Sequence, residues 1–130
     1  MIFGTATVLT SAGKVLSASQ MAGTTATPPS YIGIGTGATA AARTAVVGDT
    51  ALSVPAESRT NGTVTVVNTT VTGDTFQTVG VVTATAARAV DEAGIFTAST
   101  AGVMAVSATF PVINLQSGDS IQLTAQIQYS

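Results

Sequence analysis

The sequence predicts a mainly β protein, an antiparallel β-sandwich with an N-terminal arm and one short helix. Ala, Val and Thr dominate the 130 residues while aromatic residues make up only 5%, and branched Val and Thr side chains pack well on a pleated sheet. Short apolar stretches alternate with polar residues at a period of two. Gly-Asp steps separate several of these stretches, as turns between antiparallel strands do.

The start of the chain predicts one short strand and one weak helix. The strand is expected over residues 2–9, whose apolar side chains include those of Ile2, Phe3, Val8 and Leu9. Thr10 or Ser11 can cap the helix, and Gly23 can end it in a left-handed turn. We expect this segment to be part of the mature protein and not a signal peptide, because it lacks a basic leading region.

Two prolines separate this segment from the rest of the chain. Pro28 and Pro29 forbid a helix and favour an extended crossing. We therefore predict an N-terminal arm over residues 1–27 and a β-sandwich domain over residues 28–130.

The first part of the sandwich domain contains one strand and a long irregular stretch. Residues 31–35 are expected to be a strand, and residues 38–56 mostly irregular chain. Asp49 can cap a helical turn within that stretch, which Pro55 would end.

The chain after Gly62 consists of predicted strands. Residues 63–71 and 75–85 form a hairpin, and the slip of the alternation at Val66 and Val67 indicates a β-bulge. A further strand over residues 103–112 places on one face Met104, Val106, Ala108, Phe110 and Val112.

The final strand, over residues 120–130, has the clearest alternation in the chain. One face carries Ile121, Leu123, Ala125, Ile127 and Tyr129. The other face carries Gln122, Thr124, Gln126 and Gln128. This polar face is either exposed to water or buried as a ladder between protomers, and the sequence leaves both readings open.

Three Gly-Asp steps predict turns, in which the aspartate bonds the backbone two residues on and the glycine takes a positive φ. Their aspartates are Asp49, Asp74 and Asp119. Calcium sites gather several carboxylates in one short loop. Each of these loops offers one, so we expect no metal ion.

The composition argues against an enzyme. The chain has no His and no Cys, which removes the usual nucleophile activation and most zinc and iron sites. Carboxylate chemistry needs clustered acids, and the chain has six Asp and Glu in total. We expect no catalytic residue and no cofactor.

The charge and hydropathy patterns argue against nucleic acid and membrane partners. The net charge is −2 and only four basic residues are present, whereas nucleic-acid binding requires a dense basic stripe. Every apolar stretch is interrupted well short of the ~18 residues that span a bilayer.

One glycine-rich segment matches a dinucleotide-binding fingerprint. Gly33, Gly35 and Gly37 have the required spacing, and Glu57 lies at a suitable distance for a ribose contact. That motif requires a strand, a tight turn and a helix within a βαβ unit, and no such alternation follows. We interpret the glycines as a loop or as a place of tight strand packing.

The remaining charged residues suggest local pairs. Asp91 and Glu92 are adjacent, and Arg88 lies three residues before Asp91, which predicts a local ion pair at a turn. Glu57 and Arg59 share a face if the chain is extended, which predicts a structural pair that fixes the loop to the sandwich.

Several of these segments, in order, resemble a family of small tailed-bacteriophage virion proteins, described as capsid decoration (cement) proteins or as tail fibre proteins. The resemblance covers most of the chain after Pro28 and rests on residues 31–37, 49–52, 57–59, 73–80, 89–96, 118–123 and 129–130.

The resemblance implies a structural protein that binds the outer surface of the major capsid protein shell and stabilises it. Such a protein lies on the capsid surface of a virion assembled in the host cytoplasm, and it associates with copies of itself, trimers being favoured over dimers. The many small side chains, such as those of Ala, Thr and Ser, imply that a single copy buries little apolar surface in its core. We therefore expect contacts with partner proteins to bury additional apolar surface. We expect the contacts in the strand of residues 2–9, at Ile2, Phe3, Val8 and Leu9, and at an exposed sheet edge.

Two other classes remain. One is a tail, baseplate or tail-fibre component with a receptor-binding role, for which few aromatic side chains are present. The other is a nucleotide-binding or hydrolytic domain that uses the glycine-rich loop.

Overall fold

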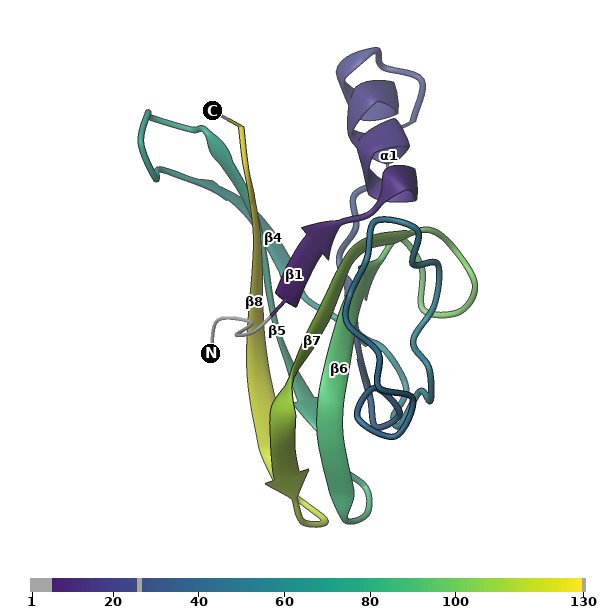
Figure 1. The fold of residues 1–130 in the computed structure, drawn as a ribbon. Helices are drawn as coiled ribbons and strands as arrows, with labels where there is room; N and C mark the ends of the chain where they lie inside the picture. The colour runs from purple at the N-terminus through teal and green to yellow at the C-terminus, as the bar shows by residue number, and fades with distance from the viewer. Residues whose placement is uncertain (1–5, 26, 130) are drawn as a thin grey trace.

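The fold is mainly β, with two antiparallel sheets and one helix (Figure 1). A computed structural model describes residues 6–25 and 27–129. Strands account for 45% of the chain and the helix for 9%, which confirms the predicted sandwich-like class.

Two sheets of unequal size form the sandwich. The order of strands in the five-stranded sheet is β1 (Ala6–Leu9), β7 (Met104–Leu115), β6 (Arg88–Phe96), β2 (Tyr31–Gly35) and β3 (Thr60–Asn61). The order in the three-stranded sheet is β4 (Thr63–Val67), β5 (Thr75–Thr83) and β8 (Ser120–Gln128). All neighbours run antiparallel, and the predicted hairpin is the β4–β5 pair.

The apolar core lies between the two sheets. Its fully buried members include Ile32, Val82, Val90, Ile95 and Leu123. β8 follows its predicted alternation, because its apolar residues are buried or half-buried against the core while Gln122, Gln126 and Gln128 are exposed.

β7 departs from the predicted one-sided pattern. Residues 104–110 are buried on both faces, while Val112 is exposed, so the prediction for Val112 was wrong. The register of the β6–β7 pair shifts between Val90 and Glu92, opposite the part of β7 that contains Pro111. Proline cannot donate to a strand ladder and is tolerated at such bulges.

The bulge predicted at Val66 and Val67 is absent. The two residues pair in regular register with Phe76 and Thr75, and β4 ends at Val67. The doubled valine therefore marks the end of the strand and not an inserted residue.

The predicted helix is α1 (Ser11–Met21), and its start is fixed to β7. The hydroxyl of Thr10 accepts the amide of Gly13 at 2.9 Å and donates to the carbonyl of Met104 at 2.5 Å. Gly23 has a φ of 70°, as the predicted left-handed turn requires. Among the described residues, no helix has both the length and the apolar character needed to cross a bilayer.

Strand β1 lies within the five-stranded sheet. It pairs with β7 from Ala6 opposite Thr109 to Leu9 opposite Val106. The predicted boundary at residue 27 stays a prediction, but the segment before it contributes an edge strand to the sandwich.

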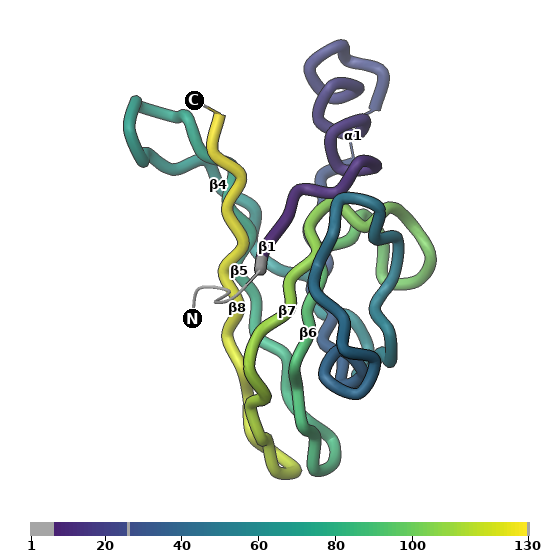
Figure 2. Tube along the Cα trace, in the orientation of Figure 1, coloured from purple at the N-terminus to yellow at the C-terminus, as the bar shows by residue number. Residues whose placement is uncertain are grey.

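The C-terminal end of β8 and the helix α1 lie at the same end of the molecule (Figure 2). There the hydroxyls of Tyr129 and Ser17 form a hydrogen bond of 2.6 Å, which links the three-stranded sheet to the helix.

Candidate functional site

A strip of three glycines leaves part of one face of the five-stranded sheet without side chains. Gly33 and Gly35 in β2 share with Gly94 in β6 the face that points away from the core. A Cβ atom at Gly33 would lie 3.2 Å from the ring of Phe96 and 3.4 Å from Leu52, and one at Gly35 would overlap Glu92. A side chain at Gly35 is therefore excluded, and one at Gly33 would force its neighbours to shift.

Residues 36–59, here called the covering loop, lie over this strip. The loop appears as the blue segment beside β6 in Figure 1. Its returning half runs along β2, where the amide of Thr36 donates to Val54 and the amide of Ala56 donates to Ile34, each at 3.0 Å. Gly37 is packed against Val54 as well, so all three predicted glycines serve close packing. None of the three has a positive φ.

The nucleotide-binding reading of these glycines does not fit the geometry. Residues 38–42 form turns and not the helix whose N-terminus would hold a pyrophosphate. The side chain of Glu92 fills the space next to Gly35 and would repel a phosphate. Glu57 faces Arg88 and Thr85.

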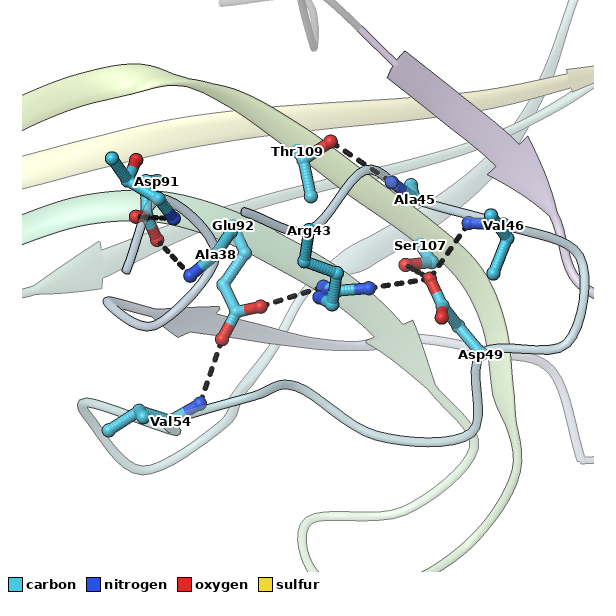
Figure 3. Close-up of polar contacts among 11 residues, drawn as sticks. Ala38, Arg43, Ala45, Val46, Asp49, Val54, Asp91, Glu92, Ser107 and Thr109 are labelled. Carbon is cyan, nitrogen blue, oxygen red and sulfur yellow. Dashed lines mark hydrogen bonds and ion pairs between the residues drawn. The ribbon is translucent and has the colours of Figure 1, made fainter. Parts of the chain in front are cut away.

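An ionic cluster fixes the covering loop to the sheet (Figure 3). Arg43 of the loop donates to Glu92 of β6 and to Asp49 of the loop, each at 2.7 Å. Glu92 is fully buried and accepts the amide of Val54 at 3.0 Å. The same oxygen of Asp49 that meets Arg43 also accepts the hydroxyl of Ser107 at 2.6 Å.

Asp91 holds the first part of the covering loop. Its two carboxylate oxygens accept the amides of Ala38 at 3.0 Å and Thr39 at 2.7 Å. Nearby, the hydroxyl of Thr109 accepts the amide of Ala45 at 3.1 Å. Adjacent carboxylates on β6 thus bind different parts of one loop.

Hydrogen bonds keep the carboxylates of Glu92, Asp49 and Asp91 ionised. Burial alone would raise the pKa of Glu92, but the Val54 amide and the Arg43 guanidinium outweigh it and lower the pKa below its ordinary value. The pKa of Asp49 is lowered in the same way by Ser107, Val46 and Arg43 against the effect of burial. The amides of Thr39 and Ala38 do the same for the pKa of Asp91.

This arrangement favours a structural role for the cluster. Each carboxylate already accepts hydrogen bonds from the protein, and none has the raised pKa of a general acid. In the described part of the chain, no group of three His, Cys, Asp or Glu side chains could hold a metal ion.

The predicted ion pairs were wrong in their partners. Arg88 does not pair with Asp91 at a turn, since both residues belong to β6, and it donates to Glu57 at 2.8 Å instead. Glu57 therefore does not pair with Arg59.

Arg59 stabilises a second loop. Its Nη1 donates to the carbonyls of Ala98 at 3.0 Å and Ala101 at 2.6 Å. Its guanidinium carbon lies 3.4 Å from the centroid of the Phe96 ring. An open hollow of about 490 Å³ lies beside this pair, but the guanidinium that borders it already binds the loop of residues 97–103.

The predicted turn aspartates accept amides that precede them, contrary to the prediction. Asp74 accepts the amides of Thr69, Thr70 and Val71, whose hydrogen bonds lower its pKa. Asp119 accepts the amide of Gln116, and Asp49 accepts that of Val46.

The glycines of these turns follow the prediction in two of three cases. Gly73 and Gly118 have positive φ values of 73° and 90°, whereas Gly48 does not. The helical turn predicted to start at Asp49 is absent, because its carboxylate binds backward into the ionic cluster.

The covering loop presents apolar side chains to solvent. The exposed fractions of Val46, Val47 and Val54 are 54%, 48% and 51%. Of the predicted contact residues, Val8 and Leu9 are half-buried in β1, while Ile2 and Phe3 lie outside the described residues. A partner contact through these four residues stays a prediction.

Sequence reasoning missed Arg43 and the role of β6. A signal was present, because Asp91 and Glu92 are followed by an apolar stretch that is typical of a buried strand. Two carboxylates beside such a stretch require buried donors, and Arg43 is one of four basic residues in the chain.

No family model, curated protein or solved structure matches this chain.

Proposed function

We propose that the protein is a structural component of a bacteriophage virion, a decoration protein that binds the outer surface of the major capsid protein shell and stabilises it. The choice of a phage shell rests on the sequence resemblance described above. The covering loop gives that proposal a candidate binding surface.

The observation that carries the proposal is the fixed covering loop with its exposed valines. Four of the six acidic residues (Asp49, Glu57, Asp91 and Glu92) and two of the four basic residues (Arg43 and Arg88) hold this loop on the sheet. A surface that is already ordered loses little conformational entropy when it docks. Such a loop suits a protein whose work is adhesion.

The surface chemistry supports a contact of this kind. Val46, Val47 and Val54 are apolar, and each is about half exposed. Burial of such side chains against a partner is favourable by ~25 cal/mol per Å² of apolar surface. Val46 and Val47 are adjacent, so one contact could bury both.

The test is binding to expanded capsid shells that lack this protein. We expect saturable binding with a fixed number of copies per shell, measured by co-sedimentation. The Val46→Asp/Val47→Asp double variant should bind at least ~10-fold more weakly, because it places two charges in an apolar contact. Val66→Asp, at the 68% exposed Val66 of the other sheet, is the matched control and should bind as the wild type does.

Cryo-electron microscopy of the parent particle distinguishes the shell from the tail. Density on the shell lattice with the covering loop toward the capsid protein supports the proposal. Density confined to the tail or baseplate, or equal binding by the double variant, contradicts it.

A further inference from the structure

Strand β8 is a long sheet edge without the features that usually protect one. Within the described residues, β8 pairs with β5 along one side and has no strand neighbour on the other. Its nine residues contain no charge and no proline. Natural edge strands are commonly short, charged, bulged or covered.

The other edges differ from β8 in length. β1 has four residues, β3 has two and β4 has five. β8 also pairs with β5 over its full length in one continuous register, from Ser120 opposite Thr83 to Gln128 opposite Thr75. A partner strand could therefore pair with β8 along its whole length without meeting a β-bulge.

The hydrogen bonds at both ends of β8 show which backbone groups face the open side. Tyr129 donates to the carbonyl of Asp74 at 2.9 Å, and Ala84 donates to the carbonyl of Asp119 at 2.8 Å. Both bonds belong to the register of the β5–β8 pair, in which bonded residues alternate. The odd-numbered residues of β8 therefore bond β5, and the even-numbered residues direct their backbone groups outward.

The even-numbered residues also carry the polar side chains. Gln126 donates through Nε2 to Oε1 of Gln77 at 2.7 Å, and Gln77 in turn donates to the hydroxyl of Thr65. This ladder crosses the outer face of the three-stranded sheet and ends at β8. A glutamine amide both donates and accepts, so Gln126 keeps its Oε1 as an acceptor for a further strand.

We propose that two copies of this chain pair antiparallel through β8, about a two-fold axis at Thr124. Thr124 then faces Thr124 of the second copy, and Gln122 faces Gln126 of the second copy on the polar side. On the core side, Ile121 faces Ile127 and Leu123 faces Ala125 of the second copy. The two three-stranded sheets become one continuous six-stranded sheet.

The strand is self-complementary in this register, which favours a second copy over a foreign strand. Thr124 is the middle residue of Ser120–Gln128, so the two strands overlap along their whole length. Amide meets amide, apolar residue meets apolar residue, and no like charges approach each other. A two-fold axis closes the assembly at two copies and pairs the β8 edge of each copy with that of the other. This inference goes beyond the proposed function and holds whatever surface the protein binds.

The first experiment changes the residue on the axis. Thr124→Lys and Thr124→Glu each place two like charges opposite one another, which should weaken the dimer at least ~100-fold. An equimolar mixture of the two variants should restore a dimer, because Lys then faces Glu. Thr65→Lys, at an exposed position on the same face in β4, is the matched control and should stay dimeric.

The measurement is the mass in solution by sedimentation, with circular dichroism as a check of folding. The wild type is expected at twice the chain mass of 12.8 kDa. A monomeric wild type at ~100 μM would overturn the proposal, even if the chain binds a foreign strand. Thr124→Lys that remains dimeric, or a Lys and Glu mixture that remains monomeric while folded, would overturn it too.

A second experiment tests the register directly. The chain has no Cys, so Thr124→Cys introduces a single thiol. Opposite residues of a hydrogen-bonded antiparallel pair have Cα atoms about 5.5 Å apart, within the range a disulfide spans. Mild oxidation should therefore crosslink Thr124→Cys into a dimer and leave Thr65→Cys uncrosslinked. The reverse result, or no crosslink at either position, would contradict the register.

Discussion

Arg43 and Glu92 lie 49 residues apart in the sequence, and their side chains meet at 2.7 Å beneath the covering loop. Glu92 is fully buried, whereas the side chain of Arg43 keeps 18% of its surface exposed. The pair therefore connects a strand of the sandwich to a segment with no regular secondary structure. Loss of this ion pair should therefore destabilise both β6 and the covering loop.

Replacing Arg43 by Met should destabilise the fold by about 3 kcal/mol, because Glu92 would become a buried charge without a counter-charge. Urea denaturation measures the free energy of unfolding. Arg88→Met is the comparison, because the Arg88 side chain is 32% exposed and Glu57 keeps the amide and hydroxyl of Thr85 as donors, so its loss should cost less, about 1 kcal/mol. A change for Arg43→Met no larger than that for Arg88→Met would show that the buried Glu92 does not depend on Arg43.

Acid should destabilise the protein through the same cluster. The pKa values of Glu92, Asp49 and Asp91 are lowered in the folded state, so the unfolded chain binds more protons as the pH falls. Their contribution is present above the ordinary pKa values of 4.5 and 3.8 and is lost as the pH falls through the lower folded values.

We expect the free energy of unfolding to be nearly constant above about pH 5 and to fall steadily below it. Urea denaturation between pH 3 and pH 7 tests this, and Asp91→Asn should flatten the slope. A stability that rises on acidification would mean that these carboxylates are not stabilised in the folded protein.

Gly13→Ala should destabilise the protein although Gly13 lies in a helix. In an exposed helix this change is worth about 1 kcal/mol of added stability. Here the new Cβ would overlap the carbonyl oxygen of Ala105 and lie 2.9 Å from its Cα, so a loss of about 1–3 kcal/mol is expected.

Gly48→Ala is the comparison for that variant. A Cβ at Gly48 would meet no atom within 4 Å, and its φ is not positive. Thermal unfolding should therefore show an unchanged or slightly higher melting temperature for Gly48→Ala. If Gly13→Ala also raised the melting temperature, the close packing of α1 on β7 would be incorrect.

Arg59→Lys should loosen the loop of residues 97–103 without unfolding the sandwich. Lysine keeps the charge but loses the planar group that stacks on Phe96 and binds the two loop carbonyls. Hydrogen exchange should speed up at the amides of this loop and stay unchanged in β5 and β8. Arg88→Lys should leave the loop unaffected, and equal acceleration everywhere would argue for a global effect.

The sequence was sufficient for elements whose signal is local. The alternation from Ile121 to Gln128 is decided by which side of one strand meets the core. The helix was recognisable from Thr10 and Gly23, because a cap and a left-handed turn depend on adjacent residues.

The partners of charged residues could not be found in this way. Arg88 is close in sequence to Asp91, yet β6 carries its side chain toward Glu57, which is 31 residues away. Local spacing predicts contacts only if the backbone conformation is known, and β6 was not predicted. The covering loop was predicted as irregular. Its position over the glycine strip could not be predicted, because it depends on contacts with β2, β6 and β7 together.

The order of strands in the five-stranded sheet also constrains when the protein can fold during synthesis. β1 is made before β7, with which it pairs, and β2 is made before its neighbour β6. β2 can pair with β6 only after Phe96 has been made, and β1 with β7 only after Thr109 has been made, so most of the sheet forms late. Pairing between such distant segments is slow. Newly made chains should therefore remain open to chaperones and proteases until β7 has been made.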